Sequence, residues 1–366
     1  MSGRIRVHYS VRVENQRDAR VRADAIAREQ TVELPRGGYP SHLDDRIVGA
    51  IESVEPGAPG QWRIIISYDP FTAGDDLPQL MNLLYGNVSL LTDIGIAEVE
   101  LPEQILDGYA GPAFGLDGLR KITGVYDQPI IVGTIKPMGL SSKDLAALCS
   151  TFADAGIDIV KDDHGITNQP TAPFDDRVRL CQQAVATSNE RRQGSTLYVP
   201  NVTAEPGEIE RRVEYAKSAG CRAVLIAPGL TGLGAMKALT QMDVAVLAHP
   251  AGSGSFLRGS GLPAPFLYGT LFRIAGADGV IYVNAGGRFP LTEEECQAIN
   301  HRAREPLGQI RASLPIAGGG VDAGRVEYWI RRYGKDVGFL VGSSLYAQAD
   351  LGCAVRTLVT AVADAS

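Results

Sequence analysis

The chain of 366 residues is 45% hydrophobic and 21% charged, and its formal net charge is −7. This composition is typical of a globular protein with room for about two domains. The negative charge and the lack of a Lys/Arg run argue against nucleic-acid binding, and no apolar run is long enough to span a membrane. The five cysteines are scattered without a CxxC spacing. The N-terminus has no signal-peptide core, so we expect reduced thiols in a cytoplasmic protein.

Strands and helices alternate in the N-terminal third of the chain. The residue patterns predict strands at 4–13, 62–68 and 95–101, and helices at 17–29 and 76–85. This order predicts a small α+β domain over residues 1–122. Residues 102–124, which are rich in Gly, Ala and Leu, are expected to connect it to the rest of the chain.

From residue 130 the pattern changes to short apolar strands separated by amphipathic helices, for example at 142–155 and 208–219. Strands are predicted at residues 130–135, 157–161, 197–201, 223–227, 244–248, 279–283, 315–317 and 338–341. Eight such units predict a TIM (β/α)8 barrel over residues 123–366. The alternative is an open α/β sheet, but no GxGxxG follows the first strand.

One of these strands runs directly into a cluster of charge. The second barrel strand ends at Lys161 and is followed by Asp162, Asp163 and His164. Alternate residues of a strand share a face, so Lys161 and Asp163 are expected to point the same way. Buried groups of this kind need a metal, a polyanionic ligand or water. The alternative is a solvated turn of charged residues at a strand end.

The other strand ends strengthen the first interpretation, because a barrel places its active site at the carboxyl ends of its strands. Polar residues or glycines follow seven of the predicted strands. They are Lys136, Lys161, Asp163, His164, Asn201, Thr203, His249, residues 284–288, Gly318, Gly319, Gly320, Gly342, Ser343 and Ser344. The glycines after the last two strands lie where barrels bind phosphate through backbone N–H groups. Each glycine alone is explained by a turn, and His249 alone by a hydrogen bond at the rim.

The same segments resemble the large subunit of RuBisCO, over nearly the whole chain. Lys161-Asp162-Asp163, followed by Asn168-Gln169-Pro170, resembles the metal-site segment of that family. The other matching segments are Gly133-Thr134-Ile135-Lys136-Pro137, Gly86-Asn87-Val88, Ala248-His249-Pro250-Ala251, Ala317-Gly318-Gly319-Gly320, Val341-Gly342-Ser343-Ser344 and Arg28-Glu29-Gln30-Thr31.

The resemblance implies a role for each matching position. Lys161, as N6-carboxylysine, would bind Mg2+ with Asp163 and His164, although His164 would alternatively act as an acid or base. Catalytic roles fall on Lys136, Lys161, His249 and Arg288. Binding of a sugar phosphate falls on Glu29, Asn87, Asn201, Gly318, Gly319, Gly320, Gly342 and Ser343. In the family the glutamate matched by Glu29 enters the neighbouring subunit's site, so a homodimer or higher oligomer with shared sites is expected.

Departures from the family pattern argue against carboxylation. His164 replaces the third metal-ligating glutamate, and Pro250 replaces an arginine that holds a substrate phosphate. Arg288 stands where the loop after the sixth strand carries a lysine that orients CO2. The Lys-Pro-Lys of the first strand reads Lys136-Pro137-Met138. This is the pattern of a RuBisCO-like protein of the form IV group.

RuBisCO-like proteins act on sugar monophosphates through an enediolate. We expect a 5-methylthioribulose 1-phosphate isomerase of methionine salvage, because Lys136 and His249 supply two groups for 1,3-proton transfer. The first alternative is a 3-oxo-isoapionate 4-phosphate decarboxylase, in which Arg288 would hold the substrate carboxylate. The others are a 2,3-diketo-5-methylthiopentyl-1-phosphate enolase and a non-catalytic protein that binds sugar phosphates.

Overall fold

The structure is a computed structural model that describes residues 3–44, 46–257 and 261–366. The chain divides into two compact units. Unit 1 comprises Met1–Ala110, Ser253–Leu267 and Leu307–Ile310, and unit 2 comprises Gly111–Gly252, Tyr268–Pro306 and Arg311–Ser366. The domain boundary after residue 122 remains a prediction. Among the described residues, no helix has the length and apolarity needed to cross a membrane.

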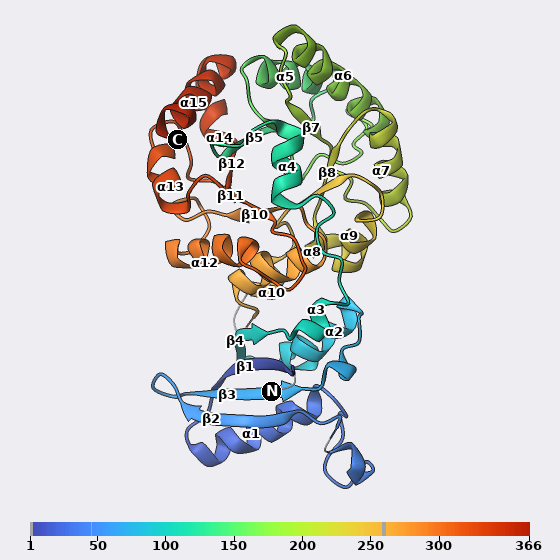
Figure 1. Cartoon of the computed structure of the whole chain (residues 1–366), viewed down its shortest axis with the longest axis vertical. Coiled ribbons are helices and arrows are strands. Elements are labelled where there is room, and N and C mark those ends of the chain that lie inside the picture. The colour runs from blue at the N-terminus through green and yellow to red at the C-terminus, as the bar shows by residue number, and fades with distance from the viewer. Residues whose placement is uncertain (1–2, 45, 258–260) are drawn as a thin grey trace. The chain divides into compact units, whose positions relative to one another are not determined.

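Unit 1 is built on a four-stranded antiparallel sheet with the order β2-β3-β1-β4 (Figure 1). Its strands are β1 (Ile5–Arg12), β2 (Ala50–Pro56), β3 (Gln61–Tyr68) and β4 (Ile94–Glu100). Alternate residues of β1 are fully buried, as the sequence pattern predicts. Strand β2 was not predicted, because its side chains are exposed or half-buried and show no alternation. Such a pattern is common at the edge of a sheet.

Helix α1 (Gln16–Glu29) packs against this sheet and was predicted nearly to the residue. It begins where the Asn15 side chain accepts a hydrogen bond from the backbone N–H of Asp18. The other helices of unit 1 are short: α2 (Leu77–Tyr85), α3 (Glu103–Leu106), α10 (Gly254–Leu257), and the 3-10 turns η1 (Ser41–Leu43), η2 (Pro70–Thr72) and η3 (Asn87–Leu90).

Unit 2 contains an eight-stranded parallel sheet with the order β7-β6-β5-β12-β11-β10-β9-β8. Its strands are β5 (Ile130–Ile135), β6 (Ile159–Asp162), β7 (Leu197–Val199), β8 (Ala223–Ile226), β9 (Ala245–Ala248), β10 (Gly279–Val283), β11 (Leu314–Gly318) and β12 (Gly338–Val341). A parallel bridge between Asn201 and Leu225 joins the two end strands and closes the ring. The predicted TIM barrel is therefore confirmed, and all eight predicted strands are present.

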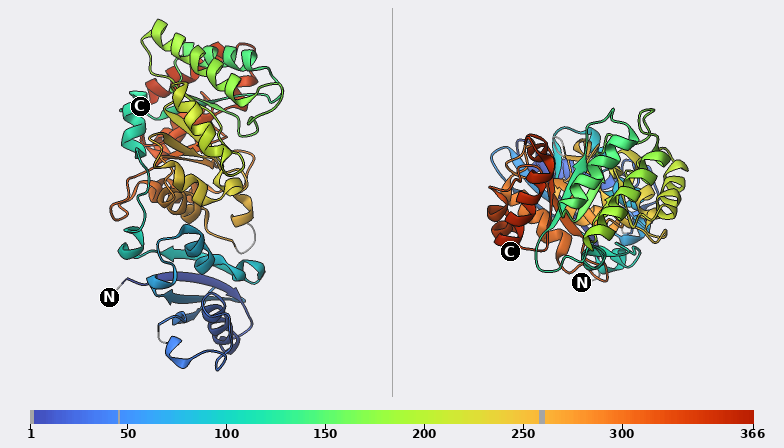
Figure 2. Two further views of the ribbon diagram at one scale, coloured as in Figure 1. Left: turned by 90° about the vertical axis from the view of Figure 1, so that its right-hand side faces the viewer. Right: turned by 90° about the horizontal axis from the view of Figure 1, so that it is seen from above.

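Helices surround the strands of unit 2 in both views (Figures 1 and 2). They are α5 (Ser142–Asp154), α6 (Phe174–Arg192), α7 (Glu208–Ser218), α8 (Pro228–Thr231), α9 (Leu233–Leu239), α11 (Phe272–Ile274), α12 (Glu293–Arg304), α13 (Val326–Tyr333), α14 (Ser343–Tyr346) and α15 (Leu351–Ala365), with a π-helical segment at Pro265–Leu271 before α11. Capping boxes begin α5 at Ser141 and α12 at Thr292.

Helix α4 (Gly115–Thr123) lies within the segment expected to be only a connection. Its Leu116, Leu119 and Ile122 belong to the apolar core inside the barrel. The backbone N–H groups of Phe114 and Gly115 both donate to Asp278, which precedes β10. Helix α4 therefore covers the amino ends of the strands, and the carboxyl ends remain for the site.

Candidate active site

Lys161 is a buried amine at the end of β6, with 1% of its surface exposed. Its Nζ donates to the carbonyl oxygen of Asp162 at 2.9 Å and to Thr134 Oγ1 at 3.5 Å. The loss of hydration on burial lowers the pKa of Lys161 to about 8, against the opposing attraction of Asp163. A larger fraction of this amine than of an exposed lysine is therefore neutral at physiological pH. The neutral amine is the form that reacts with electrophiles.

Asp163 brings together the groups that follow two strands. Its Oδ2 lies 4.0 Å from Lys136 Nζ, and its Oδ1 lies 3.3 Å from His164 Nδ1 and accepts the Gly165 backbone N–H at 3.0 Å. Lys136 Nζ in turn lies 3.2 Å from the point where a Cβ on Gly342 would be. Residues from β5, β6 and β12 therefore meet at the carboxyl end of the barrel.

Two imidazole rings stack at this mouth. The ring centroids of His164 and His249 lie 4.5 Å apart with an interplanar angle of 13°. Burial is the largest cause that lowers the pKa of each histidine, and the pKa of His249 falls well below its usual range. Both rings are therefore neutral at pH 7.

The partners of the two rings let us assign their tautomers. The Ala251 backbone N–H donates to His249 Nδ1 at 3.1 Å, so the proton of His249 is on Nε2. His164 Nδ1 faces the Asp163 carboxylate, which only accepts hydrogen bonds, so the proton of His164 is on Nδ1. His249 thus presents an N–H at Nε2, and His164 presents a lone pair at Nε2.

Thr134 and Tyr346 support Lys136 and were not identified from the sequence. The Tyr346 hydroxyl donates to the Thr134 carbonyl at 3.1 Å and accepts the Lys136 backbone N–H at 3.2 Å. Burial raises the pKa of Tyr346 to about 12, so the hydroxyl keeps its proton. Thr134 pairs with Lys161 in the β5–β6 register. That register would have indicated Thr134 from the sequence, whereas Tyr346 gave no local signal.

The glycines after β10 and β11 lie against each other. Gly319 and Gly320 have φ values of 98° and 66°, a conformation that only glycine adopts without strain. A Cβ on Gly320 would lie 2.8 Å from the carbonyl carbon of Gly286 and 2.9 Å from the nitrogen of Gly287. The two loops therefore approach backbone to backbone, and a side chain at position 320 would force them apart.

The remaining predicted residues fall in separate places. Arg288 is exposed and near enough to His164 to contribute to the lowering of its pKa. The side chain of Asn201 is directed into the chain and donates to the carbonyls of His164 and Ile166. In unit 1, Asn87 Nδ2 donates to Glu29 Oε1 at 2.9 Å, so these two predicted residues form a pair.

Comparison with known proteins identifies the family of the chain. Residues 115–354 match the family model of the ribulose bisphosphate carboxylase large chain, catalytic domain. The chain is 35% identical to the 5-methylthioribulose-1-phosphate isomerase of Rhodospirillum rubrum, over 96% of this chain and 93% of that protein. It is 28% identical to a 2,3-diketo-5-methylthiopentyl-1-phosphate enolase of Bacillus anthracis, over 81% of this chain and 74% of that protein.

A solved structure gives the same result. The crystal structure of a RuBisCO-like protein from Rhodopseudomonas palustris superposes with a TM-score of 0.90 at 35% identity, and the match covers 100% of this chain and 99% of that one. With the matched barrel and the lysines and aspartate gathered at its mouth, the chain belongs to the RuBisCO large-chain family.

Proposed function

We propose that this protein is a non-carboxylating, form IV RuBisCO-like enzyme that isomerises 5-methylthioribulose 1-phosphate by 1,3-proton transfer, as a step of methionine salvage. The observation that carries the proposal is the group formed by Lys136, Lys161, Asp163 and the stacked pair His164–His249. The relative from Rhodospirillum rubrum, whose name states this activity, supports the choice of substrate.

We propose that Mg2+ binds at Lys161, Asp163 and His164, with Lys161 as N6-carboxylysine. Among the described residues, no three His, Cys, Asp or Glu side chains are grouped so as to hold a metal. Asp163 and His164 Nε2 supply two donors, so a carbamate on Lys161 is needed as the third. The lowered pKa of Lys161 fits this role, because only the neutral amine adds to CO2. Mg2+ held there would polarise the substrate ketone.

The proton transfers fall to the other groups at the mouth. In each of two successive steps, Lys136 Nζ takes a proton from the carbon beside the ketone and returns it to the former ketone carbon. The ketone thereby moves two carbons along the chain, which is a net 1,3-proton transfer in which no proton is gained or lost. His249 gives its Nε2–H to the ketone oxygen as negative charge develops there and takes back the proton of the neighbouring hydroxyl, as a neutral imidazole does when its pKa is low. Gly318, Gly319, Gly320, Gly342 and Ser343 are proposed to hold the phosphate.

Two substitutions favour a monophosphate over the bisphosphate of a carboxylase. Pro250 follows His249 and offers neither charge nor a backbone N–H to a second phosphate. Met138 lies in the loop after β5, beside Gly165, and is 57% exposed. A charged side chain at this position would bind a phosphate, whereas the thioether of methionine packs against an apolar group. A methylthio group at the far end of the substrate fits these residues.

One observation favours a second candidate. Arg288 lies near His164 with its guanidinium exposed, and a guanidinium is suited to hold the carboxylate of a 3-oxo-isoapionate 4-phosphate before decarboxylation. The enolase name of the Bacillus anthracis relative supports a third candidate at lower identity.

The deciding experiment is proton NMR in D2O with Mg2+, bicarbonate and 5-methylthioribulose 1-phosphate. Deuterium incorporation with a shifted ketone supports the isomerase. No exchange with this substrate, but loss of CO2 from an oxo-apionate phosphate, overturns the isomerase in favour of the decarboxylase. Binding of both compounds without exchange or product makes the protein a non-catalytic binder of sugar phosphates.

We also propose a cytoplasmic homodimer with shared sites, in which the Glu29–Asn87 pair enters the partner's site. Leu90, in the same turn as Asn87, is 81% exposed, which suits an interface. The five cysteines are free thiols, as expected in a reducing compartment. Mixing inactive E29Q and K161M subunits should restore about a quarter of the activity, because half of the dimers are mixed and each has one intact site. No restoration would overturn sharing.

A further inference from the structure

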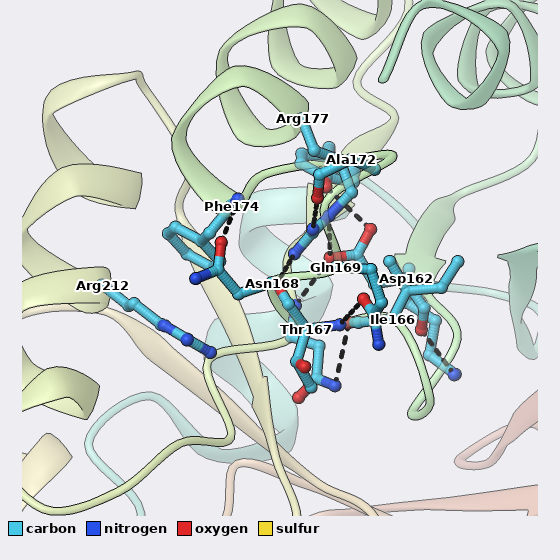
Figure 3. A network of polar contacts seen from close by, with 12 residues as sticks. Asp162, Ile166, Thr167, Asn168, Gln169, Ala172, Phe174, Arg177 and Arg212 are labelled. Carbon is cyan, nitrogen blue, oxygen red and sulfur yellow. Dashed lines mark hydrogen bonds and ion pairs between the residues drawn. The ribbon is translucent and has the colours of Figure 1, made fainter. Parts of the chain in front are cut away.

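Asp162 is a fully buried carboxylate between the two proposed metal ligands Lys161 and Asp163, yet it points away from them. It accepts hydrogen bonds from Arg177 Nε at 3.1 Å, from the Tyr198 hydroxyl at 2.8 Å and from the Asn201 backbone N–H at 2.9 Å. Neither Asp162 nor Arg177 exposes any of its side chain. The ion pair joins β6 to α6 (Figure 3), and the bonds from Tyr198 and Asn201 add the end of β7.

Arg177 extends from this carboxylate to the loop that carries His164. Its Nη2 donates to the Thr167 carbonyl at 2.8 Å and its Nη1 to the Ala172 carbonyl at 2.9 Å. Figure 3 shows the guanidinium between Asp162 and these two parts of the loop. The planar fork of arginine makes three directed contacts at once, which a lysine cannot do.

Asn201 holds the near end of the same loop. Its Nδ2 donates to the His164 carbonyl at 3.0 Å and to the Ile166 carbonyl at 3.2 Å, while its Oδ1 accepts the Thr203 N–H at 3.1 Å. The side chain is 1% exposed. Its donors and its acceptor all have partners within the chain, so it has little left to offer a substrate.

The loop keeps its shape through hydrogen bonds and not through regular structure. Besides the contacts of Arg177 and Asn201, these bonds run within the loop itself, for example from Gln169 Nε2 to the Gly165 carbonyl and from the Phe174 N–H to Asn168 Oδ1. Residues 163–173 are all described and contain neither helix nor strand, apart from one bridge between Gln169 and Ala172. His164 itself is half-exposed, and its ring contacts Asp163 and the His249 ring. Its backbone carbonyl is held by Asn201 alone among the described hydrogen bonds.

We infer that Arg177 and Asn201 form a loop clamp, a pair of positioning residues that fix His164 over His249 through Asp162. We place neither residue of the clamp among the groups that bind substrate or metal, because the polar atoms of both side chains have partners within the chain. Their effect on catalysis is to keep His164 in place, and a displacement of about 1 Å in such a group is enough to reduce the rate about 100-fold. This inference rests on the proposed function and adds that buried residues outside the site determine the position of His164.

The test compares each clamp residue with a matched residue at the opposite end of the barrel. N201D keeps the acceptor for Thr203 and removes both donors, and its control is N189D, because Asn189 pairs with the backbone N–H and carbonyl of Thr196 in the same manner. R177K is matched by R120K, because Arg120 also binds backbone carbonyls and one aspartate while buried.

The first readout does not require activity. The chain has five histidines, so spectra of protein labelled with 15N-histidine are simple, and H164Q and H249Q assign the two stacked rings. N201D and R177K should shift the signals of both rings, whereas N189D and R120K should leave them in place. N201S, which removes the donors without adding charge, replaces N201D if that variant does not fold.

The second readout is steady-state kinetics with Mg2+ and bicarbonate. The clamp variants should lower kcat about 100-fold while KM changes less than about threefold, and the control variants should change neither by more than about twofold. Unshifted ring signals in both clamp variants, at a loss of stability equal to that of the controls, would overturn the inference. Lack of turnover by the wild type would refute the proposed function instead, and the ring signals would still decide on the clamp.

Discussion

Replacing Lys161 by methionine should stabilise the protein while abolishing its activity. The charged amine is disfavoured in the folded state, where burial lowers the pKa of Lys161 to about 8, compared with about 10.4 in an unfolded chain. A difference of about 2.4 pH units at about 1.4 kcal/mol each amounts to about 3 kcal/mol at pH 7. Loss of the hydrogen bond to the Asp162 carbonyl offsets about 1 kcal/mol. K161M should therefore gain about 2 kcal/mol.

The sign of the pH dependence follows from proton binding. Between pH 8 and about 10.4 the unfolded chain binds more protons at this lysine than the folded one, so wild-type stability rises with pH there. K161M lacks this titration. Its advantage should be full below pH 8 and should shrink as the pH rises above 8.

The assay is urea unfolding followed by the fluorescence of Trp329. The chain has two tryptophans, and a W62F background leaves Trp329, which is buried in unit 2, as the reporter of the barrel. K143M serves as a control because Lys143 is exposed, and it should change stability by less than about 0.5 kcal/mol. A K161M protein less stable than wild type at pH 7, or a difference that does not vary with pH, would refute the reasoning.

Three other substitutions test other parts of the structure. D158N should raise the free energy of unfolding by on the order of 1–2 kcal/mol at pH 7. Burial raises the pKa of Asp158 to about 6, so the wild type loses stability as the pH rises from 4 through 6. A difference in urea midpoint between D158N and wild type that persists at pH 3.5 would contradict this. G320A should cost about 1–3 kcal/mol more than G334A, since both glycines have positive φ but only Gly320 meets backbone atoms, and it alone should raise KM for the phosphorylated substrate. R288A should lower kcat/KM less than about tenfold for an isomerase and more than about 1000-fold for a decarboxylase.

The barrel was predictable because of how it is buried. Its strands are covered on both faces, so they appear in the sequence as short apolar runs that stand out between amphipathic helices. Helix α4 was not predicted, because Gly115 and Gly118 weaken the helical pattern of residues that pack inside the barrel. Strand β2 was missed for the opposite reason, since its edge position leaves no buried face to create a pattern.

The site was predictable only as far as strand ends define it. Lys136, Asp163 and His249 follow strands directly and Lys161 lies at the end of one, so the barrel topology alone places them at one rim. Tyr346 binds the Lys136 backbone from 210 positions away. Periodic patterns in the sequence report on neighbouring residues and cannot predict a contact over so many positions. This contact arises only when the ring of strands closes. The clamp depends on similar contacts, since the Asn201 and Arg177 side chains act on a loop without regular structure.

The charges at the mouth explain why His164 and a monophosphate belong together. With Lys161 as an amine, the site gathers the basic side chains of Lys136, Lys161 and Arg288 around the single carboxylate of Asp163, while burial lowers the pKa of both stacked rings. A carbamate on Lys161 adds one negative charge, which a divalent cation more than balances. A glutamate at position 164 would add another negative charge, whereas the neutral histidine leaves net positive charge for the anion that must bind. One phosphate dianion neutralises that charge. A second phosphate would lack a cationic partner at position 250, which is a proline.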